Sequence, residues 1–319
     1  MVHRIGFIGA GDVVRKAYLP AVTRRADCRV VAICSESGRT ARELAAREGI
    51  PTVCNEYGEL LEHPEIDTVF VCTPTHLHRE MAETAMSRQK NVLVEKPLCA
   101  TYADARALLQ KAAGYPKTFY PAFNNQFREE NQWLRAEVLS GELGMVRLMD
   151  FEWYRTKRYE DKAWLYDAKR SGGGVLMDLG SHLIHLALSL IPNRRRFTAY
   201  CHSLCHSPAS SSVEDTSAAM VVVDEQILIH LRVGWDMKME TKSCVVLEVH
   251  GTAGRLSNLD YAGSKRDGYE AMVDDFLGHI EEGRTRDLAL VADAMLLLDV
   301  LYRSSSARTA ISGTFGGMA

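Results

Sequence analysis

Three side chains that can transfer protons or bind metals, Asp178, His182 and His185, lie within the stretch GGGVLMDLGSHLIHL at residues 172–186. At 100° per residue they share a narrow wedge with Ser189. A solvated helix face would be wide and charged, so this narrow polar stripe indicates a polar cleft. Asp178 and His182 are one turn apart, and the carboxylate can therefore orient the imidazole for general acid–base chemistry. Metal binding is less favoured, because zinc-binding helical histidine pairs are usually spaced i, i+4 and these are spaced i, i+3.

A lysine and a run of glycines are the next residues whose positions suggest chemistry. Lys96 follows the apolar run NVLV, where a lysine rarely stands without a partner, and Glu95 or a ligand could supply one. Ligands bind at the carboxyl ends of strands in open α/β sheets, so function and a strand-end salt bridge are equally open for Lys96. The run SGGG at 171–174 predicts a close approach between the backbone and a ligand.

The elements that hold these residues alternate regularly over the first 120 residues. Short apolar runs predict buried parallel strands, and the amphipathic segments between them predict helices. The strands are predicted at 4–9, 29–35, 68–74 and 91–97, and the helices at 39–48, 78–89 and 101–114. This alternation predicts a doubly wound α/β domain over residues 1–120.

The pattern changes after residue 120. A helix is predicted at 130–144, and a final helix is predicted around 287–307. Between them, longer runs of alternating polarity predict a large, mostly antiparallel open sheet. These runs lie at 145–155, 216–224, 226–237 and 243–251. We therefore predict a second domain of the α+β class over residues 121–319.

The first strand leads into GFIGAGDVV, which opens a helix and has the context of a dinucleotide-binding motif. Gly9 permits the tight turn, and Gly11 lets the backbone approach a pyrophosphate at the helix N-terminus. Val14 stands at the third glycine position, where its side chain is expected to push the helix away from the strand.

The end of the second strand bears on the choice of dinucleotide. An acidic residue there binds the ribose 2′-hydroxyl of NAD, whereas basic residues accommodate the 2′-phosphate of NADP. Ser35 and Arg39 favour NADP, and Glu36 could instead serve NAD. The sequence therefore predicts NADP or NAD, with a slight preference for NADP.

Composition bounds the class of protein. The 319 residues are 46% hydrophobic and 25% charged with a net charge of −3, which predicts a globular protein with no preference for nucleic acid or membrane. No apolar run suits a signal peptide or a membrane span, so a cytoplasmic location with eight reduced cysteines is expected. The cluster CHSLCH at 201–206 lacks the usual zinc spacing, and a polar strand end or loop is preferred there.

Six motifs together resemble the Gfo/Idh/MocA oxidoreductases over nearly the whole chain: GFIGAGDV, VFVCTPTHLH, VLVEKPL, GGGVLMDLGSHLIH, VEDTSAAMV and VHGTAGRL. The resemblance implies an N-terminal Rossmann domain that binds NAD or NADP. It implies a C-terminal domain that binds substrate and whose sheet forms homodimer or homotetramer contacts. Family members oxidise or reduce hydroxyl or carbonyl groups of sugars and cyclitols. Matched by motif, Lys96, Asp178 and His182 correspond to the family's catalytic trio.

The motifs and the segments beside them give the expected contacts. The residues expected to bind the cofactor are Gly9, Ala10, Gly11, Asp12, Val13, Ser35, Glu36, Arg39, Thr73, Pro74, Thr75, His78, Glu95, Lys96 and Pro97. The residues expected to bind the substrate are Lys96, Asn124, Gln126, Trp153, Tyr154, Asp178, His182 and His185. No metal is expected. His185 and Gln126 stand where the family often has aspartate and arginine, so we expect substrate choice to differ here.

The predicted function is hydride transfer between nicotinamide and a secondary alcohol or ketone of a sugar, amino sugar or cyclitol. The amino-sugar option comes from five acidic residues near the predicted cleft, although ordinary surface charge is the favoured interpretation of them. These residues are Glu129, Glu130, Glu152, Asp161 and Asp167. A dinucleotide-binding regulator is an alternative, for which the catalytic trio is unnecessary. A glycosidase that uses bound NAD in a transient oxidation is another.

Overall fold

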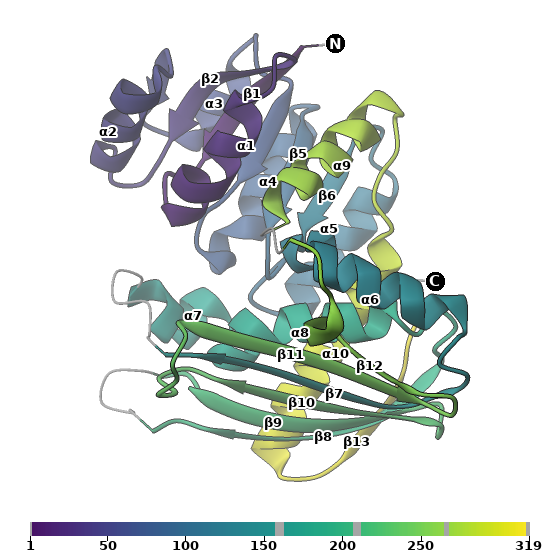
Figure 1. Ribbon diagram of the computed structural model, residues 1–319. Coiled ribbons are helices and arrows are strands. Elements are labelled where there is room, and N and C mark those ends of the chain that lie inside the picture. Colours follow the sequence, from purple (N-terminus) through teal and green to yellow (C-terminus); the bar gives the residue numbers. More distant parts are fainter. Residues whose placement is uncertain (1, 157–162, 207–211, 265–267, 317–319) are drawn as a thin grey trace. The chain divides into compact units, whose positions relative to one another are not determined.

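The computed structural model describes residues 2–156, 163–206, 212–264 and 268–316, and its contacts divide the chain into two compact units (Figure 1). Unit 1 comprises residues 1–99, 107–127 and 267–288. Unit 2 comprises residues 100–106, 128–266 and 289–319. These discontinuous units differ from the single border after residue 120 that the sequence predicts, because a late segment of the chain returns to unit 1. The functional division at that border stays a prediction.

Unit 1 is built on a six-stranded parallel sheet with the order β3-β2-β1-β4-β5-β6. Its strands are β1 (His3–Ile8), β2 (Cys28–Cys34), β3 (Thr52–Cys54), β4 (Thr68–Val71), β5 (Asn91–Glu95) and β6 (Phe119–Ala122). The predicted doubly wound α/β fold is thus confirmed, with β3 and β6 added to the four predicted strands. The strand order reverses between β1 and β4, and ligands of open α/β sheets bind at such a reversal.

The helices of unit 1 include one that comes from the far end of the sequence. Before it come α1 (Leu19–Thr23), α2 (Arg39–Glu48), α3 (Tyr57–Glu62), α4 (His78–Ser87) and α5 (Tyr102–Ala113), of which α5 begins in unit 2. Helix α9 (Tyr269–Glu281) packs on the same core through Phe276, whose ring lies 5.6 Å from that of Phe70. The predicted helices do not include α9, and the pattern of an isolated amphipathic helix does not show which sheet the helix covers.

Unit 2 is built on a seven-stranded sheet with the order β12-β11-β7-β10-β9-β8-β13. Its strands are β7 (Val146–Arg155), β8 (Arg196–Leu204), β9 (Thr216–Val223), β10 (Ile227–Gly234), β11 (Ser243–Gly251), β12 (Arg255–Ser257) and β13 (Ile311–Thr314). The described pairs are antiparallel except β7 with β10, so the predicted mostly antiparallel sheet is confirmed. Strand β8 contains Cys201 and ends at Leu204, just before Cys205.

One face of this sheet is covered by helices. Along β8 and β9 every second side chain is buried, as expected for a half-covered sheet. Helix α8 (Ser181–Ser189) packs on β7 and β10, and α10 (Leu288–Ala307) bonds to β8 through Ser304 and Ser305. The remaining helices are α6 (Glu129–Ser140) and α7 (Ala168–Ser171).

Among the described residues, no helix is long and apolar enough to span a membrane. In the same residues all eight cysteines are free thiols.

Candidate functional site

The loop between β1 and its helix has the geometry that a dinucleotide-binding turn needs. Gly9 has φ +114°, and a Cβ there would lie 2.3 Å from the carbonyl oxygen of Cys72. A Cβ on Gly11 would meet nothing within 4 Å. Gly9 is therefore required by the protein's own backbone, whereas the space beside Gly11 is open to a ligand. The loop follows β1 at the reversal of strand order, where a pyrophosphate would meet backbone N–H groups of the helix start.

The helix that follows this loop begins with Val14, whose side chain points into the core of unit 1. Val14 is fully buried in the core of unit 1, and it begins a π-helical turn, Val14–Tyr18, that continues into α1. The Val14 side chain thus lies inside the core, and its effect on the separation of helix and strand stays a prediction. Ala10 is also buried, and Val13 packs against the same core, so their contribution to cofactor binding would come from the backbone.

The side chain of Asp12 is already paired within the same helix. Its carboxylate forms ion pairs with Arg15 and with Lys16, whose Nζ lies 2.8 Å from Oδ2. The hydrogen bond from Lys16 is the largest cause that lowers the pKa of Asp12. Asp12 would therefore contact a dinucleotide through its N–H rather than through its carboxylate.

The segment after β2 leaves polar groups available for a ribose. The Ser35 hydroxyl oxygen is buried and has no hydrogen-bond partner among the described residues, which is costly unless a ligand supplies one. The Arg39 side chain is 83% exposed, and its Nε lies 3.9 Å from a carboxylate oxygen of Glu43. Glu36 is exposed. These residues fit the adenosine side of a nicotinamide dinucleotide, and the geometry leaves both NAD and NADP open.

The loop after β4 is tied to the loop after β5 by a histidine. His78 is buried, with Nδ1 3.0 Å from the carbonyl oxygen of Pro97 and Nε2 2.8 Å from that of Thr73. Burial lowers the pKa of this imidazole. His78 therefore holds, from inside, the loop that is predicted to line the cofactor. Thr75 is likewise buried. Of the residues in this loop, Thr73 and Pro74 are therefore the ones that we still predict to contact the cofactor directly.

The strand end that carries Lys96 is held by Glu95. The buried Glu95 carboxylate accepts a hydrogen bond from the Tyr18 hydroxyl at 2.6 Å and another from the backbone N–H of Lys96 at 3.0 Å. Burial, and then the nearby Glu95 carboxylate, raises the pKa of Tyr18 well above its usual range. The phenol therefore stays protonated and donates. Glu95 thus positions the Lys96 backbone, and Lys96 itself is half-buried.

In unit 2, Asp178 and His182 lie on either side of a change in helix type. Residues Leu176–Gly180 form a π-helical turn in which the Ser181 N–H donates to the carbonyl of Leu176, five residues earlier. The α-helix α8 then begins at Ser181. The turn between Asp178 and His182 is therefore partly π-helical, and the fixed 100° per residue of an α-helix does not describe it. Such turns are frequent at functional sites.

The stripe that carries the two histidines does not face bulk water. His182 is 4% exposed and His185 1% exposed, and Ser189 is also buried. Every residue of helix α8 is buried, so both imidazoles lie in surroundings that mostly hold apolar side chains. Asp178, one turn before His182, is half-buried.

An aromatic ring covers His182. The Trp153 ring centroid lies 5.4 Å from that of His182, and the Trp153 indole N–H donates to the Ser243 hydroxyl at 2.8 Å. Tyr154 follows on the same strand, and successive side chains of a strand point to opposite faces. The structure therefore separates the two predicted aromatic contacts: Trp153 shares a face with His182, and Tyr154 lies on the other face.

The structure gives a different reason for the glycines at 172–174 from the predicted one. A Cβ on Gly172 would lie 2.3 Å from the carbonyl oxygen of Ala100, and one on Gly174 would lie 1.9 Å from that of Glu214. A Cβ on Gly173 would lie 2.0 Å from the Tyr302 hydroxyl. The close approach that SGGG predicted is thus made by the protein itself rather than by a ligand.

Two models of one family match the two parts of the chain. The model described as "Oxidoreductase family, NAD-binding Rossmann fold" matches residues 3–123, and the "GFO/IDH/MocA C-terminal domain" matches residues 131–257. The chain belongs to the Gfo/Idh/MocA oxidoreductase family. The observed fold and the recognised motifs agree with this membership.

Individual relatives are distant. D-Glucoside 3-dehydrogenase of Escherichia coli (strain K12) is 28% identical over 188 residues, which are 59% of this chain and 54% of that protein. The chain thus spans about half the length of this curated relative. The structure of myo-inositol 2-dehydrogenase from Lactobacillus plantarum has a TM-score of 0.87 at 18% identity and covers 99% of this chain and 100% of that one. Levoglucosan dehydrogenase in complex with NADH and levoglucosan has a TM-score of 0.85 at 17% identity, with 98% and 99% covered.

Two residues predicted to bind substrate lie in unit 1. Asn124 and Gln126 belong to the short 3₁₀ turn Asn124–Phe127 that follows β6. Asn124 is buried, and Gln126 is half-buried. Their assignment to substrate binding stays a prediction.

The acidic residues considered for a cationic substrate have local partners. Glu129 accepts hydrogen bonds from the hydroxyls of Tyr261 and Ser264, and Glu130 pairs with Arg128 at 2.7 Å. The remaining two described carboxylates are also used, Glu152 by Arg232 and Asp167 by the N–H of Lys169. Asp161 lies outside the described residues. Each of the four described carboxylates thus has a protein partner, although Glu130 is buried rather than on the surface.

Only one group of described residues brings three potential metal ligands together, namely His3, Asp27 and Glu281. Arg25 donates to both carboxylate oxygens of Asp27, at 3.0 and 2.7 Å, so this ligand is already neutralised by a cation. We interpret the group as an ion-pair network. In the CHSLCH cluster, His206 instead pairs with Asp215 at 2.6 Å.

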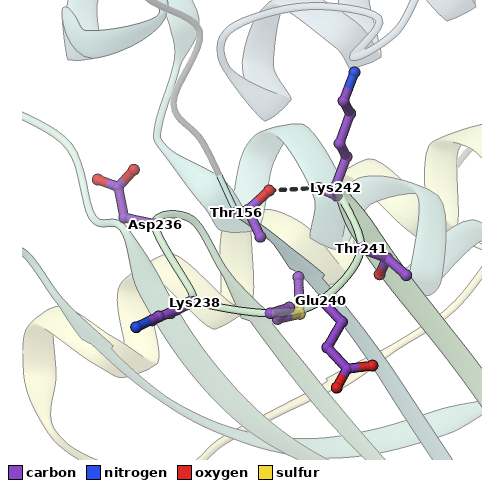
Figure 2. A pocket seen from close by; sticks show the side chains of 7 residues that line it. Thr156, Asp236, Lys238, Glu240, Thr241 and Lys242 are labelled. Carbon is purple, nitrogen blue, oxygen red and sulfur yellow. Dashed lines mark hydrogen bonds between the residues drawn. The ribbon is translucent and has the colours of Figure 1, made fainter.

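A pocket of about 370 Å³ lies beside the end of β7, and Figure 2 shows the side chains that line it. It is lined by Thr156, Asp236, Lys238, Met239, Glu240, Thr241 and Lys242. The Thr156 hydroxyl donates to the carbonyl of Lys242, and the labelled charged side chains point away from one another rather than converging. The pocket contains none of the predicted site residues, and we do not assign the chemistry to it.

Proposed function

We propose that this protein transfers a hydride between a nicotinamide dinucleotide and a ring carbon that bears a secondary alcohol, or the matching ketone, of a sugar-like substrate. The observation that carries the proposal is the buried His182, one turn after Asp178 and beneath Trp153, in a chain that also has a dinucleotide-binding turn. The names of the relatives support the substrate class, because glucosides, inositols and levoglucosan all have secondary ring hydroxyls.

In the oxidation direction we assign three roles. His182 accepts the proton of the substrate hydroxyl as the hydride leaves the same carbon. Lys96 donates a hydrogen bond to that oxygen and stabilises its developing negative charge. Asp178 orients the imidazole of His182. Bound nicotinamide supplies the hydride acceptor, and in the reduction direction each proton step reverses. Of the two predicted aromatic contacts, we retain Trp153 as the residue that covers substrate or nicotinamide.

The direct test is a titration with NADH and NADPH followed by a panel of neutral sugars, amino sugars and cyclitols. We expect substrate-dependent formation of reduced nicotinamide, seen at its absorbance band. Dinucleotide that stays bound through turnover without net reduction would favour the glycosidase instead. Dinucleotide binding with no turnover on the whole panel would favour a regulator. Because the acidic residues have local partners, we expect neutral sugars or cyclitols to be better substrates than amino sugars.

For the cofactor we propose a slight preference for NADP, supported by Ser35 and by the exposed guanidinium of Arg39. Arg39→Ala should then weaken NADPH binding several-fold and leave NADH binding nearly unchanged, because only NADPH carries the 2′-phosphate. Calorimetric titration of both dinucleotides measures this. Equal affinity of the unmodified protein for both dinucleotides would remove the preference and leave Glu36 as the ribose contact.

We further propose a homodimer or homotetramer joined through the face of the unit 2 sheet opposite α8 and α10. Three large apolar side chains on this face are 38–47% exposed, and two of them, Tyr200 and Met220, are cross-strand neighbours; the third is Leu204. Met220→Glu should lower the mass measured by light scattering, because an unpaired carboxylate is costly to bury in an interface. A monomeric unmodified protein would contradict this assembly.

A further inference from the structure

The start of the helix that carries Asp178 and His182 is held by a carboxylate from a distant part of the chain. Glu214 Oε1 accepts hydrogen bonds from the backbone N–H groups of Gly174 and Leu176, each at 3.0 Å. The Gly174 N–H also lies 3.0 Å from Oε2. In addition, the backbone N–H of Val175 donates to the Glu214 carbonyl at 3.0 Å. Three consecutive backbone N–H groups at the helix start therefore donate hydrogen bonds to one residue, Glu214.

A tyrosine completes this clamp. The Tyr302 hydroxyl, from α10, donates to Glu214 Oε1 at 2.8 Å. Burial, and then the Glu214 carboxylate, raises the pKa of Tyr302 well above its usual range, so the phenol stays protonated and donates. Glycine at 173 is what allows this hydroxyl to come so near, and glycine at 174 allows the Glu214 backbone to do the same.

The clamp replaces an ordinary helix cap. A helix start leaves several N–H groups without intrahelical partners, and Val175, at the cap position, has no side-chain oxygen with which to satisfy them. Burial raises the pKa of Glu214, while the hydrogen bonds from Tyr302 and from the backbone N–H groups act in the opposite direction, as does the partial positive charge of the helix N-terminus. The π-turn begins directly at Leu176, and the Asp178 N–H donates to the carbonyl of Gly174, the residue that Glu214 holds.

We propose that Glu214, assisted by Tyr302, is a positioning residue that sets the placement of Asp178 and His182. It contacts no reacting atom. The expected effect on kcat rests on the proposed function, whereas the expected effect on the helix start does not. Without the clamp, the helix start would lose its N–H acceptors and its π-turn could shift. A displacement of about 1 Å in a catalytic group can cost roughly 10²-fold in rate.

The experiment compares Glu214→Ala with Glu214→Gln. Three of the four side-chain contacts converge on Oε1, so a glutamine oxygen in that place retains them, whereas alanine retains none. We expect Glu214→Ala to lower kcat about 10- to 100-fold with dinucleotide affinity unchanged, and Glu214→Gln to restore most of kcat. Glu248→Ala, which removes a carboxylate paired with Arg255 on the sheet of the same unit, is the matched control.

Hydrogen–deuterium exchange over residues 172–186 gives a readout that does not depend on activity. We expect Glu214→Ala to speed exchange in this segment while Glu214→Gln and Glu248→Ala leave it nearly unchanged. Faster exchange without a catalytic defect would mean that the clamp exists but the proposed roles of Asp178 and His182 are wrong. Unchanged exchange and unchanged kcat in Glu214→Ala would overturn the inference itself. If the Glu214→Ala protein does not fold, Tyr302→Phe takes its place. For this variant we expect a smaller decrease in kcat and a smaller increase in the exchange rate.

Discussion

His182→Ala is expected to lower kcat by about 10²- to 10⁴-fold while dinucleotide affinity stays within about twofold. The estimate is the usual contribution of one general acid–base group. Cofactor affinity is expected to persist because the dinucleotide-binding turn belongs to unit 1 and His182 to unit 2. Steady-state kinetics with the best substrate of the panel, together with calorimetric titration of NADH or NADPH, measures both quantities. Normal turnover in this variant would contradict the assignment of His182 as the acid–base residue.

Two controls separate chemistry from packing. His182 is nearly fully buried, so alanine leaves a cavity, and His182→Gln keeps most of the volume without the acid–base function. Both variants should lose turnover, and the glutamine variant should melt closer to the unmodified protein. His202→Ala, which removes an exposed histidine of the same unit, should leave turnover unchanged.

The shared action of Lys96 and His182 can be tested by a double variant. If both groups act on one substrate oxygen, Lys96→Met with His182→Ala should lose less activity than the two single losses multiplied together. Fully multiplicative losses would indicate that the two residues act on separate steps.

Gly9→Ala is expected to destabilise unit 1 and abolish dinucleotide binding. Gly9 has φ +114°, and a methyl group there would lie 2.3 Å from a backbone carbonyl oxygen that cannot move away cheaply. The unfavourable backbone conformation alone costs about 1–3 kcal/mol. A lower midpoint of thermal unfolding, and a midpoint that no longer rises when NADH or NADPH is added, would report the two losses.

Gly11→Ala is the matched comparison, since its Cβ would meet no atom within 4 Å. We expect the unfolding midpoint to be unchanged and the dinucleotide dissociation constant to rise about tenfold or more, because the methyl group occupies the space that a pyrophosphate needs. Equal affinity in Gly11→Ala and the unmodified protein would contradict the placement of the dinucleotide over this turn.

The sequence by itself determined those features that depend on residues close together in the chain. The alternation of apolar runs and amphipathic segments predicted the parallel sheet of unit 1, and the two-residue period predicted the antiparallel sheet of unit 2. Likewise, the spacing of Asp178 and His182 was enough to put them on one side of a helix. Periodicity carries this information because burial of one face is a local property of a helix or a strand.

Only the tertiary structure decided which distant segments meet. Helix α9 joins unit 1 because Phe276 packs against Phe70, more than two hundred residues earlier in the chain. The glycines at 172–174 were correctly predicted to allow a close approach, but their partners proved to be Ala100, Glu214 and Tyr302. The π-turn before His182 was also beyond the pattern, since a fixed 100° per residue cannot describe a wider turn.

The catalytic proposal divides in the same way. Residue types and spacing named Asp178 and His182. The fold decided between the two predicted aromatic residues, because it places Trp153 over the imidazole and Tyr154 on the other face of the sheet. It also supplied Glu214 as the acceptor for the helix start. Such contacts depend on how folded segments pack against one another, and no period in the sequence records which carboxylate will meet which backbone N–H.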